Sequence, residues 1–248
     1  MKNVNTALIL AGGKGTRFSE YTKTIPKPMI NANGKPLLIH ILNIYASQGV
    51  ENFVILAGYK IEVIINYFVE NDFEKVEENI FWKNNIKIRI LDTGLETQTG
   101  GRIRQGLKYV EEDYFYLTYG DGISNINLKE LNSFYFNNET VATLTAVRPP
   151  ARFGSLELRK DNFVKAFGEK NNAKEGWING GFFLLNKSVS EYLKDDSTPF
   201  EKTPLEVLAK TNQLKAYLHF GYWRPVDTIR ELEILEQEML KGLFKFYE

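Results

Sequence analysis

A single stretch near the start of the chain contains, in order, Thr6-Ala7-Leu8-Ile9-Leu10-Ala11-Gly12-Gly13-Lys14-Gly15-Thr16-Arg17. The run from 6 to 10 is typical of a short strand that is buried on both faces of a sheet. The glycines that follow allow backbone N–H groups to converge on phosphate oxygens, and Lys14 and Arg17 add positive charge. The stretch therefore predicts either a phosphate-binding loop after a buried strand or a tight turn at the edge of the sheet.

The spacing within this loop excludes two common nucleotide-binding motifs. A P-loop requires Ser or Thr directly after Gly-Lys, but here Gly15 separates Lys14 from Thr16. The dinucleotide-binding fingerprint requires a third glycine at the position where this chain has Phe18. A nucleotide bound by this loop would therefore be bound in another way.

A lysine between two prolines follows in the segment Thr24-Ile25-Pro26-Lys27-Pro28-Met29. Proline fixes its own φ angle and restricts the residue before it, so the backbone around Lys27 is held in place. A lysine held in this way is suited to stabilise the charge of a phosphoryl group during a reaction. The alternative is a rigid loop whose lysine faces solvent.

Strands and helices alternate along the rest of the chain. Apolar runs predict strands at 6–10, 53–57, 86–92, 114–119, 141–147, 180–185 and 214–220. Apolar residues at helical spacing predict helices at 36–48, 62–68, 101–110, 128–136, 204–211 and 228–240. Alternating residues at 154–159 and 163–167 predict a small antiparallel excursion. We therefore expect one α/β domain over residues 1–248, with a mostly parallel sheet and helices on both faces.

Composition excludes several classes of function. The 248 residues include no cysteine, which excludes disulfides and thiol nucleophiles, and His40 and His219 are the only histidines. The 31 basic and 31 acidic residues balance, so no overall positive field favours nucleic acid. No apolar stretch approaches the roughly 18 residues of a membrane span. We expect a cytoplasmic protein with neither nucleic acid nor membrane as a partner.

The glycine-rich loop and the Pro-Lys-Pro segment together resemble the L-A-G-G-x-G-T-R and P-K-P motifs of the sugar-phosphate nucleotidyltransferases. Nearly the whole chain is similar to one branch of that family, the glucose-1-phosphate cytidylyltransferases. The other matching motifs are Asp92-Thr93-Gly94, Thr99-Gly100-Gly101-Arg102, Tyr119-Gly120-Asp121-Gly122, Arg152-Phe153-Gly154, Ile178-Asn179-Gly180-Gly181-Phe182-Phe183 and Trp223-Arg224-Pro225-Val226-Asp227-Thr228. The resemblance implies a Rossmann-like fold of the nucleotide-diphospho-sugar transferase type. It also implies that CTP and glucose 1-phosphate react, with magnesium, to give CDP-glucose and pyrophosphate, in the supply of sugars for surface polysaccharide.

The resemblance also assigns roles to residues within these motifs. It implies that Lys27 and Arg17 are catalytic and that Asp121 and Asp227 bind Mg²⁺. Nucleotide contacts are expected from Leu10, Ala11, Gly12, Gly13, Gly15, Thr16, Arg17, Thr99, Gly100, Arg102, Gly120 and Asp121. From their sequence context alone, Asp121 would belong to an Asp-Gly turn and Asp227 would be the N-cap of the last helix.

Contacts to the sugar phosphate are expected from Arg152, Glu169, Lys170, Asn179 and Gly180. Without the resemblance, Glu169 and Lys170 would be an ordinary solvated charge pair. The chain departs from the family at Asn171, where proline is usual, and over residues 71–87, which form a shorter segment than in the family. We expect a homo-oligomer, and in this family the subunit contacts lie near that shorter segment.

Three alternatives remain open at this stage. The same reaction could use UTP or dTTP, or another phosphorylated acceptor, because the sequence does not identify the atom that would bind the cytosine amino group. A glycosyltransferase on a similar fold normally carries Asp-x-Asp, whereas Asp121 is followed by Gly122 and Ile123. A non-catalytic nucleotide-sugar sensor would be expected to lose Lys27 or an aspartate, and none is lost.

Overall fold

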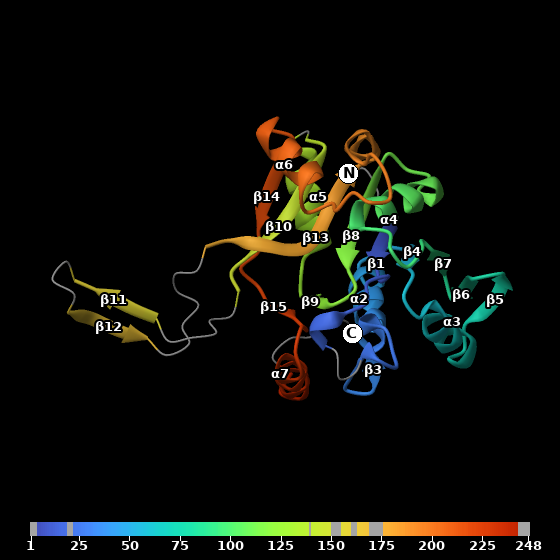
Figure 1. The fold of residues 1–248 in the computed structure, drawn as a ribbon, viewed down its shortest axis with the longest axis horizontal. Helices are drawn as coiled ribbons and strands as arrows, with labels where there is room; N and C mark the ends of the chain where they lie inside the picture. The colour runs from blue at the N-terminus through green and yellow to red at the C-terminus, as the bar shows by residue number, and fades with distance from the viewer. Residues whose placement is uncertain are drawn as a thin grey trace.

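The first predicted strand, β1 (Thr6–Leu10), is the middle strand of a nine-stranded sheet (Figure 1). The computed structural model describes residues 4–18, 22–138, 140–149, 155–159, 163–168 and 176–242. Across the sheet the order is β14 (Leu214–Leu218), β10 (Ala142–Val147), β13 (Ile178–Asn186), β8 (Tyr114–Tyr119), β1, β4 (Asn52–Ala57), β7 (Ile86–Asp92), β6 (Ile80–Lys83) and β5 (Glu74–Glu77). Of these nine strands, β13 and β6 run opposite to the others. The predicted mostly parallel sheet is confirmed.

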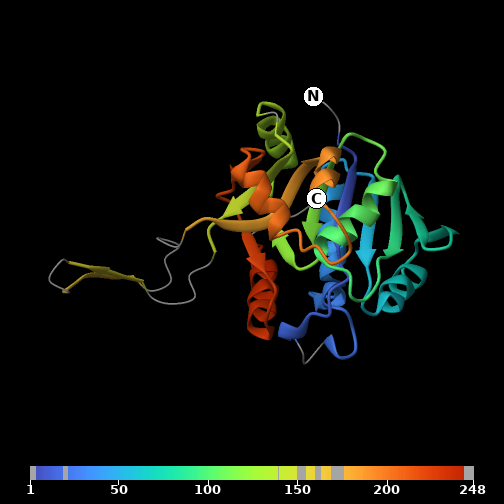
Figure 2. The same ribbon diagram turned by 45° about the horizontal axis from the view of Figure 1, so that its top comes forward.

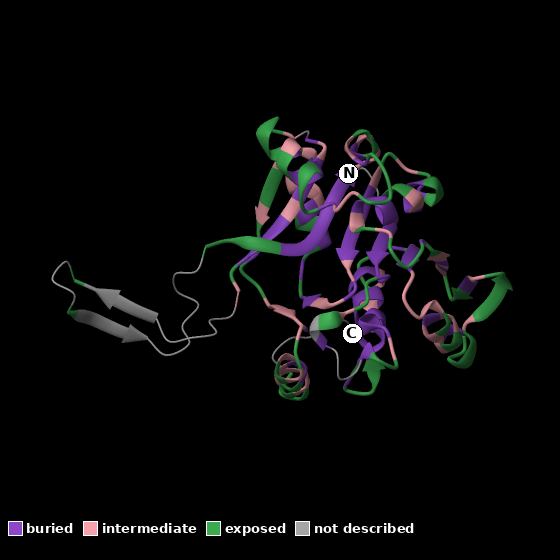
Figure 3. Ribbon diagram, viewed as in Figure 1, coloured by how far each residue is buried: buried purple, intermediate pink, exposed green. Residues whose placement is uncertain are grey.

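Alternate residues of β1 face opposite sides of the sheet and enter two separate apolar clusters. Ala7 and Ile9 pack with four helices on one side, and Leu8 and Leu10 pack with two on the other. The four helices on the side of Ala7 and Ile9 are α2 (Leu37–Ala46), α3 (Ile61–Glu70), α5 (Leu128–Phe136) and α7 (Ile229–Leu240). The two helices on the side of Leu8 and Leu10 are α4 (Thr99–Gly106) and α6 (Thr203–Lys210). Helices therefore cover both faces, as predicted (Figure 2), and the central strands are buried between them (Figure 3).

The hairpin at one edge of the sheet was not predicted. β5 and β6 pair antiparallel, and Asn79 in the turn between them is left-handed at φ 58°. All four residues of β5 are exposed, so the strand has neither an apolar run nor an apolar face on which a sequence prediction could rest. The hairpin lies within the segment, residues 71–87, that is shorter than in the resembled family.

Smaller elements complete the described chain. The predicted antiparallel excursion is confirmed as β11 (Ser155–Leu158) paired with β12 (Val164–Gly168), while Gly154 lies outside the described residues. The helix expected at 101–110 begins at Thr99 and ends as a 3-10 helix, η3 (Leu107–Tyr109). The remaining short elements are η1 (Thr16–Phe18), η2 (Lys27–Met29), β2 (Asn31–Ala32), β3 (Lys35–Pro36), β9 (Gly122–Ser124), η4 (Lys187–Tyr192) and β15 (Trp223–Pro225). None of the helices in the described part of the chain combines the length and apolar character that a membrane crossing requires.

Because β1 and β8 are parallel, the loops that follow them lie at the same edge of the sheet, the one formed by the carboxyl ends of these strands. The Ala11 amide donates to the Leu56 carbonyl at 3.0 Å, and the Gly120 amide donates to the Leu10 carbonyl at 2.9 Å. The hydrogen-bond ladder between β1 and β4 and the ladder between β8 and β1 thus each continue one residue beyond the strands, and they fix where the two loops begin. Open α/β sheets bind ligands at this edge, and the candidate site lies there.

Candidate active site

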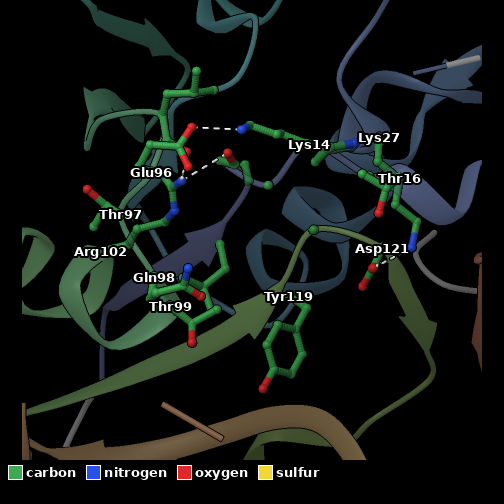
Figure 4. Close-up of a pocket in the computed structure, with 18 residues that line it drawn as sticks. Lys14, Thr16, Lys27, Glu96, Thr97, Gln98, Thr99, Arg102, Tyr119 and Asp121 are labelled. Carbon is green, nitrogen blue, oxygen red and sulfur yellow. Dashed lines mark hydrogen bonds and ion pairs between the residues drawn. The ribbon is translucent and has the colours of Figure 1, made fainter. Parts of the chain in front are cut away.

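A cavity of about 460 Å³ opens at the carboxyl ends of β1 and β8 (Figure 4). Its lining is formed by residues 10–16, 27–28, 95–99, 102 and 119–121. It therefore brings together most of the predicted nucleotide contacts, from the glycine-rich loop, the start of α4 and the loop after β8. Gly100 does not line it, and its amide donates to the Thr198 carbonyl at 2.9 Å. The Arg17 side chain lies outside what the structure describes.

The Lys27 ammonium lies at one end of this cavity and contacts two carboxylates. Its Nζ is 2.6 Å from Oδ2 of Asp121 and 2.6 Å from Oδ1 of Asp227, and its side chain is only 9% exposed. The backbone around it forms η2, in which the amide of Met29 donates to the Pro26 carbonyl at 2.8 Å. The predicted rigid Pro-Lys-Pro segment therefore holds a buried ammonium, and the alternative of a solvent-facing lysine is wrong.

Two very short strands bring Asp227 to Asp121. β15 pairs antiparallel with β9, and the amide of Val226 donates to the Asp121 carbonyl at 3.0 Å. Asp227 is not the N-cap of α7, so that alternative is wrong. The cap is Thr228, whose side chain accepts from the Glu231 amide at 3.2 Å, and the Glu231 carboxylate accepts from the Asp227 amide at 2.8 Å. Because Thr228 performs the capping, the Asp227 carboxylate is available to Lys27.

Arg102 lies beneath the glycine-rich loop rather than in an open position. Its buried guanidinium donates to the carbonyls of Gly12 at 3.0 Å and Ala57 at 2.9 Å, and also to the Thr93 hydroxyl. A Cβ on Gly58 would lie 2.6 Å from its Nη1, and a Cβ on Gly12 would lie closer still. Burial lowers the pKa of Arg102, and the charge of Asp92 partly opposes that shift. One side chain therefore ties the glycine-rich loop to the ends of β4 and β7.

The wall of the cavity that faces the glycine-rich loop is formed by residues 95–99, the loop that leads into α4. Lys14 reaches across to it and forms an exposed ion pair with Glu96 at 2.7 Å. Thr99 and Tyr119, which line the cavity, both donate from their hydroxyls to the Glu201 carboxylate, at 2.6 Å and 2.7 Å. Burial, followed by the charge of Glu201, raises the pKa of Tyr119 well above its usual value. Glu96 and Glu201 were not among the predicted site residues, because single glutamates in loops carry no pattern.

Only two of the five residues predicted to bind the sugar phosphate, Asn179 and Gly180, lie in the described part of the chain. Arg152, Glu169 and Lys170 lie outside the described residues. Asn179 is exposed at the start of β13, where its side chain accepts from the Gly181 amide at 2.9 Å. Gly181 has φ 82°, and a Cβ there would lie 2.6 Å from the Tyr119 ring. The start of β13 therefore lies directly against the end of β8, beside the cavity.

The family model described as "Nucleotidyl transferase" matches residues 6–241. The chain belongs to the nucleotidyl transferase family. It is 43% identical over 246 residues to a Bacillus subtilis protein named "Probable glucose-1-phosphate cytidylyltransferase", covering 91% of this chain and 92% of that one. It is 41% identical over 249 residues to the glucose-1-phosphate cytidylyltransferase of Salmonella typhimurium, covering 95% and 96%. Among solved structures, HddC from Yersinia pseudotuberculosis is similar with a TM-score of 0.72 and 26% identity, covering 95% and 100%.

These findings confirm the family, the fold class and the type of enzyme that the sequence predicts. The glycine-rich loop, Lys27 and the two aspartates thus lie together in a nucleotidyltransferase. Their individual roles are matters of chemistry that experiments can test.

The substitution Arg102→Lys should raise the KM for the nucleoside triphosphate by about tenfold or more, because a single ammonium cannot replace the guanidinium bridge between the Gly12 carbonyl and the ends of β4 and β7, and the glycine-rich loop is then held less firmly. Initial rates against nucleotide concentration would measure this, with thermal unfolding to report folding. Arg104→Lys is the matched control, since Arg104 is on the same helix and its Nη2 forms an exposed ion pair with Asp196 at 2.8 Å. An unchanged KM in folded Arg102→Lys would contradict the role assigned to this guanidinium.

Proposed function

We propose that this nucleotidyltransferase transfers CMP from CTP to a sugar 1-phosphate, with glucose 1-phosphate as the expected acceptor, and releases pyrophosphate. The observation that carries the proposal is the Lys27 ammonium, held at 2.6 Å by two carboxylates at one end of a cavity that a glycine-rich loop lines. Relatives named glucose-1-phosphate cytidylyltransferase support the choice of cytidylyl group and acceptor.

The proposed reaction is an in-line displacement. An oxygen of the sugar phosphate attacks the α-phosphorus of CTP, and the bond from that phosphorus to pyrophosphate breaks on the opposite side. Such a transfer needs positioning and charge stabilisation rather than a protein nucleophile, which agrees with a chain that has no cysteine. In this proposal the amides of the glycine-rich loop hold the triphosphate, and Lys27 and Arg17 offset the negative charge that develops around the α-phosphate.

Asp121 and Asp227 fit the Mg²⁺ that the resemblance implies. Their carboxylates already converge on one positive charge, the Lys27 ammonium, so the space between them favours a cation. Mg²⁺ in such enzymes takes one or two protein carboxylates and completes its shell with phosphate oxygens and water. When bound, the ion would supply positive charge to the phosphates.

The acceptor would bind beside this centre. We propose that Asn179 and Gly180, at the start of β13, contact the sugar, because β13 lies against Tyr119 at the edge of the cavity. Arg152, Glu169 and Lys170 complete this part of the proposal on the sequence prediction alone.

Pyrophosphate release with Mg²⁺ and glucose 1-phosphate should be fastest with CTP among CTP, UTP, dTTP, ATP and GTP. A coupled phosphate assay would compare kcat/KM across the five nucleotides under identical conditions. A preference for another nucleotide would retain the mechanism and overturn the base assignment. If every nucleotide is inactive, a screen of other phosphorylated acceptors follows, and failure of that screen would overturn the proposed function.

A further inference from the structure

The junction between β4 and α3 contacts the segment that leads to Lys27. Lys60 donates from Nζ to the carbonyl of Lys23 at 2.7 Å and to the carbonyl of Thr24 at 3.1 Å. The hydroxyl of its neighbour Tyr59 donates to the carbonyl of Thr22 at 2.8 Å. Two consecutive residues therefore hold three consecutive carbonyls, which lie just before the Pro-Lys-Pro segment. We call Tyr59 and Lys60 the clamp.

The backbone of Lys60 is in an unfavourable region for a residue with a side chain. Its φ is 53° and its ψ is 44°, the left-handed conformation, at the N-cap of α3. Glycine adopts this conformation more readily than lysine. The Lys60 side chain, which reaches back to the two carbonyls, is a reason for lysine to occupy this position, although its backbone conformation is costly.

The clamp is also joined to the glycine-rich loop. The amide of Tyr59 donates to the Gly12 carbonyl at 3.2 Å. The side chain of Thr22, which is buried, donates to the Gly15 carbonyl at 3.1 Å. The segment that carries Lys27 is thus fixed to both the end of β4 and the glycine-rich loop.

We propose that Tyr59 and Lys60 are positioning residues that hold residues 22–24 so that Lys27 points into the cavity between Asp121 and Asp227. This inference rests on the catalytic role of Lys27 in the proposed function. Neither clamp side chain lines the cavity, so neither is expected to touch the nucleotide. Pro26 and Pro28 limit the local backbone, and Pro28 lies against Gly120 at the end of β8. The clamp adds a second attachment, which holds the preceding residues 22–24 to the end of β4.

Lys60→Met should lower kcat about tenfold or more and change the KM for CTP less than threefold, because binding groups remain while the Lys27 ammonium is less well placed. Lys60→Arg keeps a cationic donor and should recover most of the lost kcat. Tyr59→Phe removes a single hydrogen bond and should lower kcat by a smaller factor. Lys23→Met is the matched control, since it removes one exposed positive charge from the same segment and leaves the Lys23 carbonyl in place.

A second readout does not depend on activity. Amide hydrogen exchange of the peptide covering residues 22–30 should be faster in Lys60→Met than in the wild type, and unchanged in Lys23→Met, with exchange in β1 as the internal reference for global folding. Wild-type kcat and wild-type exchange in Lys60→Met, with Lys27→Met inactive, would overturn the clamp while the proposed function stands. If the wild type turns over no nucleotide, the proposed function fails, and the exchange experiment alone decides whether Lys60 holds the segment.

Discussion

Lys27→Met should lower kcat for pyrophosphate release about a thousandfold, with the chain still folded. Removal of one preorganised donor at a developing oxyanion typically costs about two to three orders of magnitude, and the full charge of Lys27 at a reacting phosphoryl group should be worth at least as much. Methionine keeps an apolar stem of similar length, so the walls of the cavity, which the Lys27 stem helps to form, stay filled. Steady-state rates with CTP and glucose 1-phosphate would measure the loss. Lys27→Arg keeps the charge in a different shape and should be impaired less than Lys27→Met.

The same substitution has a consequence that needs no turnover. Without the ammonium, the carboxylates of Asp121 and Asp227, which both lie 2.6 Å from it, face each other without compensation. Like charges brought together destabilise the folded state unless a cation compensates them. The unfolding temperature of Lys27→Met should therefore rise more on addition of Mg²⁺ than that of the wild type. Wild-type activity in a folded Lys27→Met protein would contradict the proposed role of this lysine.

Asp121→Asn and Asp227→Asn should each lower kcat about a hundredfold and raise the Mg²⁺ concentration for half-maximal activity about tenfold. An amide keeps the shape of the carboxylate but lacks the negative charge that a hard divalent cation prefers. Activity measured against Mg²⁺ concentration at saturating CTP would separate the two effects. Asp72→Asn is the matched control, because Asp72 is an exposed turn residue with φ 56° and asparagine tolerates that conformation equally well.

The two substitutions should not be independent of Lys27. Combining Asp121→Asn with Lys27→Met removes both partners of one contact, so the loss in the double variant should be smaller than the product of the single losses. Unaltered Mg²⁺ dependence in both asparagine variants would show that the aspartates serve only to hold Lys27, and the metal assignment would then be withdrawn.

The contrast between Asp121 and Asp227 explains how much of this site the sequence predicts. Asp121 follows a strongly apolar strand, and parallel strands end at one edge of a sheet, so its position near the glycine-rich loop follows from pattern, although pattern alone gives it only the role of a turn residue. Asp227 reaches the same place through β9 and β15, each three residues long, which is too short for any periodicity to show. The resemblance supplied Asp227 where local patterns did not.

Arg102 shows a second limit of sequence reasoning. Its motif predicts a nucleotide contact, and the residue lines the cavity, but the partners of its guanidinium are backbone carbonyls and a hydroxyl from three separate segments. Every residue has a backbone carbonyl, so no sequence pattern indicates which carbonyls will accept a hydrogen bond from the guanidinium. The edge hairpin of β5 and β6 escaped prediction for a related reason, because exposed strands lack an apolar face.

The space around the Arg102 guanidinium couples positions that are far apart in the chain. Gly12 and Gly58 lie on different loops, yet the missing side chain at each position makes room for the same group. A side chain at position 12 would displace the guanidinium, and one at position 58 would meet both the guanidinium and the Gly94 carbonyl oxygen, which would lie 2.7 Å from its Cβ. Positions 12, 58 and 102, far apart in the chain, therefore form one packing unit, and a change at either glycine is felt at the arginine.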